Sequence, residues 1–125
     1  MDNYYDQASG RWVTAESRYA AIAHQPQFQD IDVVPPERAW PLILELLAAV
    51  PGDVLAYVGA GPLEAFVVRH GGQFIDQIEH EVRRNPRLRE AALEMNLARG
   101  TLPAVAEARL VAVLGPRFSL LEPEG

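Results

Sequence analysis

The residues most suited to chemistry are the two glycines of Gly59-Ala60-Gly61, which follow the apolar run Val54–Val58. If that run were a strand, the glycine turn would let the backbone approach a nucleotide or another cofactor, as in an enzyme. If the run were a helix, Gly59 would end it, and Pro62 would begin the next helix at its first position. The two interpretations predict opposite functions.

The segment from Val54 to Pro62 resembles the glycine-rich first motif of Rossmann-like methyltransferases, and the resemblance covers only that short stretch. Two features oppose it: Leu63 or Glu64 fills the third glycine position, and no acidic strand end follows about 20 residues later. We therefore favour two helices joined at a break and predict no cofactor. A small cofactor-dependent enzyme that uses the Gly59-Ala60-Gly61 turn is kept as an alternative.

A second chemical possibility is a metal site, because Asp76 and His80 are four residues apart and share a helix face. His70 and Glu79 lie nearby in the sequence. However, His70 falls on the apolar face of its own helix, and the order of a His-Glu-x-x-His motif is missing. No serine–histidine–acid set is present either, so we predict neither a metal site nor a catalytic residue. A metal-dependent enzyme using His70 and His80 remains the alternative.

Acidic side chains offer two surfaces for a protein partner. One is the loop that carries Asp30 and Asp32, and the other is a helix face that carries Asp76, Glu79 and Glu81. Tyr57 is added as an aromatic anchor, since tyrosine is enriched in binding hot spots. These six residues are the predicted partner-binding site.

One concentrated basic group stands close to these acids: Arg83, Arg84, Arg87 and Arg89. Such a group can grip a phosphate or an acidic partner through forked hydrogen bonds. We expect it instead to pair with nearby carboxylates at helix spacing, namely Glu79, Glu81 and Glu90.

Residues 1–13 are polar and show no helical or strand periodicity, so they are predicted to be a loose arm. The elements that must position the candidate residues begin after this arm. Thr14 is expected to cap a first helix that ends at His24. Prolines and aspartates mark residues 25–36 as a loop. The apolar residues between Pro36 and Val50 recur at helical spacing and predict a second helix.

Beyond Val50 the sequence predicts a string of short helices, the first of them a turn capped by Asp53. Breaks are expected at Gly59-Ala60-Gly61, at Gly71-Gly72 and at Asn85-Pro86. The helix after Asn85 is expected to reach Gly100, and Thr101 to cap a last helix ending at Leu114. The predicted fold is all-α, an irregular bundle of about six short helices or helical hairpins, in one domain spanning residues 1–125.

Composition limits the partners and the compartment. The 125 residues carry a net charge of −6, every basic residue is arginine, and cysteine is absent. An acidic protein has little general affinity for nucleic acid but attracts basic proteins. Without a signal peptide or a long apolar run, we expect a cytoplasmic protein with no membrane contact. The arginine-only usage also suggests a bacterial source.

Four stretches contain motifs similar to those of a known protein family: Ala39–Ile43, Gly59–Glu64, His70–Glu79 and Asn85–Arg89. Across them, the segment from Trp40 to Asn96 resembles a family of small, uncharacterised bacterial helical domains. The resemblance implies a helical fold and a bacterial source, and it transfers no activity.

Small size, acidity and the lack of a catalytic set favour a protein-binding module. Its most concrete form is an immunity protein or antitoxin that neutralises a basic toxin by binding it. A homodimeric structural or accessory domain is the second alternative beside the enzyme, and the sequence leaves the oligomeric state open.

Overall fold

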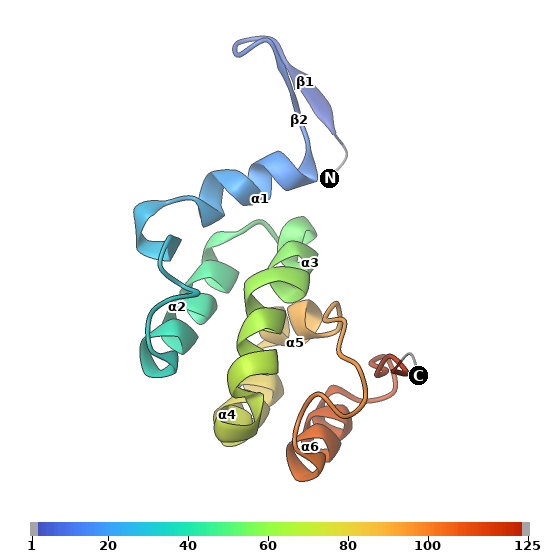
Figure 1. The fold of residues 1–125 in the computed structure, drawn as a ribbon. Helices are drawn as coiled ribbons and strands as arrows, with labels where there is room; N and C mark the ends of the chain where they lie inside the picture. The colour runs from blue at the N-terminus through green and yellow to red at the C-terminus, as the bar shows by residue number, and fades with distance from the viewer. Residues whose placement is uncertain (1–2, 124–125) are drawn as a thin grey trace.

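The computed structural model describes residues 3–123 and confirms the all-α class, with a small β-hairpin added at the N-terminal end (Figure 1). The strands are β1 (Tyr4–Asp6) and β2 (Arg11–Val13). The α-helices are α1 (Ala15–Ala23), α2 (Pro36–Ala49), α3 (Leu55–Val58), α4 (Glu64–Arg84), α5 (Pro86–Ala92) and α6 (Ala104–Leu114). Short 3₁₀ turns cover Pro26–Phe28 (η1) and Gly52–Val54 (η2), and a π turn covers Gly59–Leu63 (η3).

The core lies around α4, which packs against α2, α5 and α6. Its apolar face carries Phe66, Val67, Phe74, Ile78 and Val82, all of them buried. The long apolar stripe explains why a 21-residue helix forms here, since burial of one face stabilises a helix more than propensity does.

The N-terminal hairpin corrects the prediction of a loose arm for the part of residues 1–13 that is described; Met1 and Asp2 lie outside the described residues. Tyr5 pairs with Trp12 across the antiparallel strands, and their rings meet edge to face at 5.6 Å. Gly10, at φ 68°, allows the turn between the strands. The hairpin projects away from the helical body (Figure 1).

Helix α1 begins where the sequence predicts. Thr14 accepts a hydrogen bond from Ser17 N at 3.0 Å, and Ser17 Oγ accepts one from Thr14 N at 2.9 Å. This reciprocal capping satisfies two amide groups that the first turn cannot pair internally. The segment 25–36 is irregular as expected, apart from the turn η1, and Pro36 opens α2.

The glycine segment is a kink between helices and not a strand-to-helix turn, so the helical interpretation is confirmed. Pro62 has no N–H to donate, and its ring excludes the carbonyl of Val58 from an α-helical position. The backbone widens into the π turn η3, where Gly61 has non-helical angles (φ −114°, ψ −109°). Gly59 is buried there, and a Cβ on it would lie 1.8 Å from the carbonyl oxygen of Ala91.

The predicted break at Gly71-Gly72 is wrong, because α4 continues through both residues. The two glycines permit close packing of the chain that leads into α6. A Cβ at Gly71 would lie 2.9 Å from Leu102 Cδ2, and one at Gly72 would lie 2.9 Å from Pro103 Cγ. Their role is to provide space and not to end the helix.

The C-terminal boundaries also differ from the predictions. Helix α5 ends at Ala92 and not near Gly100, and α6 starts at Ala104 after Pro103, without a Thr101 cap. The connecting backbone finds partners outside any helix: Asn96 N donates to Glu64 Oε1 at 2.6 Å, and Gly100 N donates to Glu107 Oε1 at 2.7 Å. These tertiary bonds replace the helical ones that the prediction assumed.

Candidate partner-binding surface

The acidic helix face predicted to bind a partner is occupied from within the molecule. Arg109 of α6 reaches across to α4, where its Nη2 lies 2.7 Å from Asp76 Oδ1 and 3.1 Å from Glu79 Oε1. The hydrogen bond from Arg109 lowers the pKa of Glu79, and the bonds to Glu79 first and then to Asp76 raise the pKa of Arg109. Asp76 and Glu79 therefore join α4 to α6.

Glu81 was expected on the same exposed face, and that placement is wrong. The residue is 7% exposed, and its carboxylate accepts hydrogen bonds from Arg84 Nε at 2.6 Å and from Asn85 Nδ2 at 3.3 Å. It faces the end of α4, where it orients the Asn85 side chain that caps α5. Buried carboxylates require such partners.

The arginine group divides into two roles. Arg83 and Arg84 pair with Glu79 and Glu81 at helix spacing, as expected. Arg87 instead donates to two backbone carbonyls at the end of α2, Leu47 O at 2.7 Å and Val50 O. Arg89 donates to Leu114 O, at the end of α6, at 3.4 Å.

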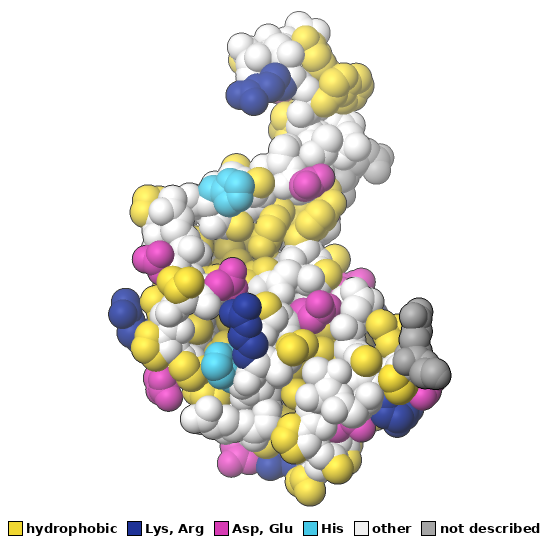
Figure 2. Space-filling view, viewed as in Figure 1, with side chains coloured by type: hydrophobic (Ala, Val, Ile, Leu, Met, Phe, Trp, Pro, Cys, Tyr) yellow, Lys and Arg dark blue, Asp and Glu magenta, His cyan; other side chains and the backbone are white. Residues whose placement is uncertain are grey.

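The other predicted surface, the loop with Asp30 and Asp32, borders a real groove. The groove has a volume of about 460 Å³ and lies between α1, the loop 25–36 and the kinked start of α4. We call it the α1 groove and define it by its lining residues: Tyr19, Ala23, His24, Phe28, Gln29, Ile31, Asp32, Leu46, Gly61, Pro62 and Ala65. Hydrophobic side chains floor a hollow below α1 in Figure 2.

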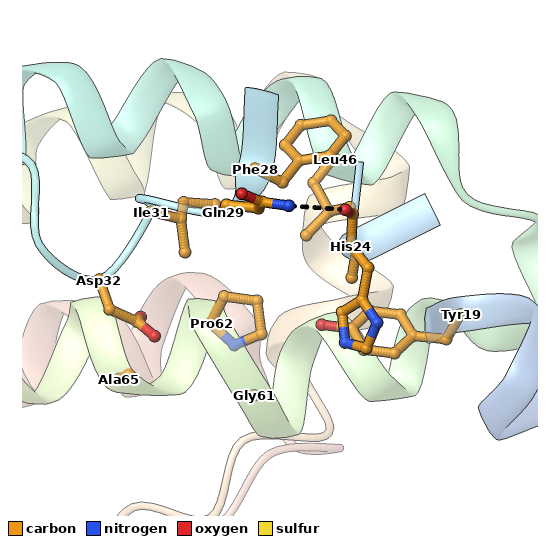
Figure 3. Close-up of a pocket in the computed structure, with 11 residues that line it drawn as sticks. Tyr19, His24, Phe28, Gln29, Ile31, Asp32, Leu46, Gly61, Pro62 and Ala65 are labelled. Carbon is orange, nitrogen blue, oxygen red and sulfur yellow. Dashed lines mark hydrogen bonds between the residues drawn. The ribbon is translucent and has the colours of Figure 1, made fainter. Parts of the chain in front are cut away.

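The polar groups of the α1 groove stand at its two ends and, at Gln29, between them (Figure 3). Asp32 lies at one end, Tyr19 and His24 lie at the other, and Pro62 lies between them. Burial first, and then the negative charge of Asp32, raise the pKa of the Tyr19 hydroxyl, which stays a neutral donor and acceptor. Gln29 fixes the loop by donating from Nε2 to His24 O at 3.3 Å.

Asp32 is held by its backbone and not by its side chain. Arg69 of α4 donates from Nη1 to Asp32 O at 3.3 Å. Among residues 3–123, no hydrogen bond or ion pair reaches the carboxylate of Asp32 or that of Asp30. Both residues are exposed, but only Asp32 lines the α1 groove.

Tyr57 lies beside the same groove. Its ring stacks on Tyr19 at 5.5 Å between centroids, with an angle of 20° between the planes. Two of the six predicted residues thus lie beside α1: Asp32 lines the groove, and Tyr57 stacks on Tyr19. Tyr19 was a candidate interface anchor as an aromatic residue, but nothing in the sequence pattern pointed to His24 or to the groove, because their place depends on how α1 meets α3 and α4.

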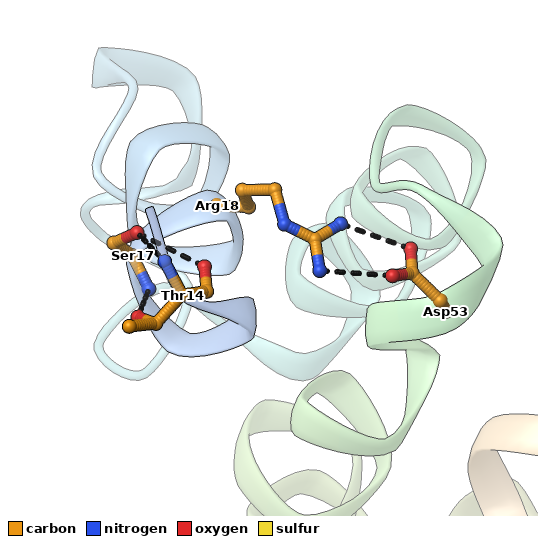
Figure 4. A network of polar contacts seen from close by, with 4 residues as sticks. All are labelled: Thr14, Ser17, Arg18 and Asp53. Carbon is orange, nitrogen blue, oxygen red and sulfur yellow. Dashed lines mark hydrogen bonds and ion pairs between the residues drawn. The ribbon is translucent and has the colours of Figure 1, made fainter. Parts of the chain in front are cut away.

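Helix α1 is held in place by an ion pair at its first turns (Figure 4). Arg18 Nη1 donates to Asp53 Oδ1 at 3.1 Å, and Nη2 lies 2.8 Å from Asp53 Oδ2. This forked contact holds the pKa of Asp53 well below its usual range. Asp53 was expected to cap a helical turn; it lies inside η2, and its carboxylate binds Arg18 instead of η2 backbone N–H groups.

The hairpin adjoins α1 and carries the most exposed aromatic residues of the described chain. Trp12 is 66% exposed, and Tyr4 and Tyr5 are each 48% exposed. The hairpin at the start of α1 therefore offers exposed aromatic rings, and the groove along the later part of α1 offers an apolar hollow and an unpaired carboxylate.

The residues of the two enzyme alternatives lie apart. Gly59 is buried against α5 whereas Gly61 lines the groove. His70 packs against Phe66 at 5.3 Å between ring centroids, and His80 is exposed on the other side of the Gly71-Gly72 segment. Residues 3–123 contain no group of three or more histidine, aspartate or glutamate side chains arranged for a metal ion.

The fold and this surface define a small helical protein with an open groove and a projecting aromatic hairpin. The chain belongs to a family of unknown function (DUF6869), whose model matches residues 15–94. The match begins at the first residue of α1 and includes the whole α1 groove, but neither the hairpin nor α6. No curated protein and no solved structure matches the chain. Within residues 3–123, no helix combines the length and apolar character needed to cross a bilayer.

Proposed function

We propose that this protein is a small acidic protein-binding module that uses the hairpin and the α1 groove as its contact surface. The observation that carries the proposal is the exposure of Trp12, Tyr4 and Tyr5 on a hairpin that projects from the body. Rigid aromatic side chains supply large contact area at low entropic cost and dominate binding hot spots. Tyr5 and Trp12 meet on one face of the hairpin, and Tyr4, the next residue along the strand, lies on the other face. Exposed aromatic residues of this kind are typical of interaction sites.

In its most concrete form, the module is an immunity protein or antitoxin of a bacterial cytoplasm, and its partner is a basic toxin. The net charge of −6 supports a basic partner, because complementary charge speeds association. The choice of surface is supported by the ion pairs of Asp76 and Glu79, which are already made within the chain. Asp32 keeps an unpaired carboxylate in the groove that Tyr19 also lines, and Asp30 is exposed on the same loop.

The test compares immobilised wild-type protein with a Trp12→Ala variant in a lysate of the source organism. We expect wild type to retain one basic protein at a stoichiometric level and Trp12→Ala to retain at least tenfold less. Val105→Ala is the matched control, because Val105 is an equally exposed apolar residue (72%) on α6, outside the proposed surface. Equal loss with both variants, or no loss with Trp12→Ala, would contradict the proposal.

The immunity or antitoxin role is tested by expressing the retained partner protein with and without this chain. Growth arrest that only the wild-type chain relieves supports an immunity role. If the only retained protein is a second copy of the chain, and light scattering gives a dimer, the homodimeric alternative replaces the proposal.

A further inference from the structure

We infer that the α1 groove is a pocket for an arginine side chain of the protein partner, with the Asp32 carboxylate as its counter-ion. The inference rests on the proposed function for the source of that arginine. It concerns a part of the surface that the hairpin does not form.

The first argument is the charge of the groove. Its lining contains one carboxylate, that of Asp32, and no arginine. Most other carboxylates of residues 3–123 already accept a hydrogen bond or form an ion pair within the chain, as Asp53 does with Arg18 and Glu79 with Arg109. A carboxylate accepts two parallel hydrogen bonds from a guanidinium, and that acceptor is unused at Asp32.

The second argument is the shape and chemistry of the walls. Between Asp32 and Tyr19 the groove has apolar walls at Ile31 and Pro62, with the Gln29 side chain beside them (Figure 3). An arginine side chain has the complementary form, because an apolar stem of three methylene groups precedes the charged head. Guanidinium is also more weakly hydrated than an ammonium, so it enters such a groove at a lower desolvation cost than lysine.

The third argument is that the loop is fixed before any ligand arrives. Arg69 holds the backbone carbonyl of Asp32 at 3.3 Å, and Gln29 binds His24 O at 3.3 Å. The loop thereby presents the Asp32 side chain to the groove while its backbone is anchored to α4. A preorganised acceptor loses little entropy on binding.

The experiment titrates the full-length ¹⁵N-labelled protein with blocked tripeptides that carry arginine, lysine, glutamine or glutamate between two glycines. We expect the arginine peptide to bind with a Kd near 1 mM, about tenfold tighter than the lysine peptide. The glutamine and glutamate peptides should not bind measurably. The amide shifts should map to the residues of the groove, above all Ile31, Asp32 and Ala65.

Two variants and one control separate the groove from general charge attraction. Asp32→Asn removes the counter-ion and should weaken the arginine peptide at least tenfold. Ala65→Leu fills the groove and should do the same while keeping every charge. Asp30→Asn removes an equally exposed carboxylate that does not line the groove, and should change Kd less than twofold.

Equal weakening by Asp30→Asn and Asp32→Asn, or shifts outside the groove, would overturn the inference. If Asp32→Asn alters the spectrum of the free protein widely, Ala65→Leu decides. Because the peptide titration uses no cellular partner, its failure is distinguishable from failure of the retention experiment, which depends on Trp12.

Discussion

At the scale of single residues, the π turn contains two glycines whose hydrogen atoms have very different surroundings. At Gly59 the space for a side chain is filled by the backbone of α5, and a Cβ would lie 1.8 Å from Ala91 O. At Gly61 the nearest atom to such a Cβ is the Tyr19 hydroxyl, at an ordinary 3.7 Å. The close approach of α3 and α5 therefore depends on Gly59.

We predict that Gly59→Ala lowers the free energy of unfolding by about 3 kcal/mol, because the backbone of α5 must move away. Thermal unfolding followed by circular dichroism measures the effect as a loss of about 10 °C in Tm. Gly61→Ala is the matched control, and we expect a clearly smaller loss. Similar values for the two variants would mean that the contact with Ala91 does not limit the structure.

At the scale of elements, α5 stabilises the end of α2 through one side chain. Arg87 donates to Leu47 O and Val50 O, carbonyls that no further turn of α2 can satisfy. Its positive charge also lies at the negative end of the α2 dipole. The contact joins residues about 40 positions apart and fixes how α2 sits against α5.

We predict that Arg87→Ala lowers the free energy of unfolding by about 2 kcal/mol, because it leaves two half-buried carbonyls without a donor. Urea unfolding provides the measurement. Arg83→Ala is the control from the same group: the Arg83 side chain is 66% exposed and its ion pair spans 3.5 Å, so we expect a loss below about 0.5 kcal/mol. Equal losses of stability in Arg87→Ala and Arg83→Ala would mean that the lost positive charge, and not the two unpaired carbonyls, causes the effect.

The contrasts between Gly59 and Gly61 and between Arg87 and Arg83 show which features could be predicted from the sequence. Caps such as Thr14 and Asn85 act on their own helix, and both were predicted from neighbouring residues. Gly59 and Gly71 look alike in the sequence, yet one adjoins the kink and the other lies inside a straight run of α4. The kink follows from Pro62, which is close in the sequence, but the need for glycine at each position follows from Ala91 and Leu102, which lie far along the chain.

The candidate site could be predicted only in part for the same reason. Asp30, Asp32 and Tyr57 are recognisable as exposed polar or aromatic residues; Asp32 lines the groove, and Tyr57 stacks on Tyr19 at its side. That Arg109 would pair with Asp76 and Glu79 depends on the packing of α6 against α4, which no local pattern states. The hairpin was missed because three-residue strands are too short for a period to be seen.

At the scale of the whole molecule, α1 and the hairpin form the least firmly held part of the described chain. No residue of α1 is buried, whereas α4 carries the centre of the core. The helix is fixed by the Arg18–Asp53 pair, by the stacking of Tyr19 on Tyr57, and by partly buried apolar residues such as Ile22 that pack against the core. Since α1 forms one wall of the groove, these contacts keep the binding surface assembled.

We predict that Asp53→Asn speeds amide hydrogen exchange in α1 at pH 7 and leaves exchange in α4 unchanged, because local opening of α1 does not disturb the core. Hydrogen exchange read by NMR checks this outcome. The folded pKa of Asp53 lies below its unfolded value, so the ion pair stabilises α1 above about pH 4 and is lost as the pH falls towards the folded pKa.

The pH dependence gives this last prediction its own control. In the wild-type protein, exchange in α1 relative to α4 should rise progressively below about pH 4, once the intrinsic exchange rate at each pH is divided out. The Asp53→Asn protein should start high and show little further rise. Asp30→Asn, which removes an unpaired carboxylate, should follow the wild-type curve. If α1 and α4 exchange together in every variant, α1 does not open separately, and the groove is as rigid as the core.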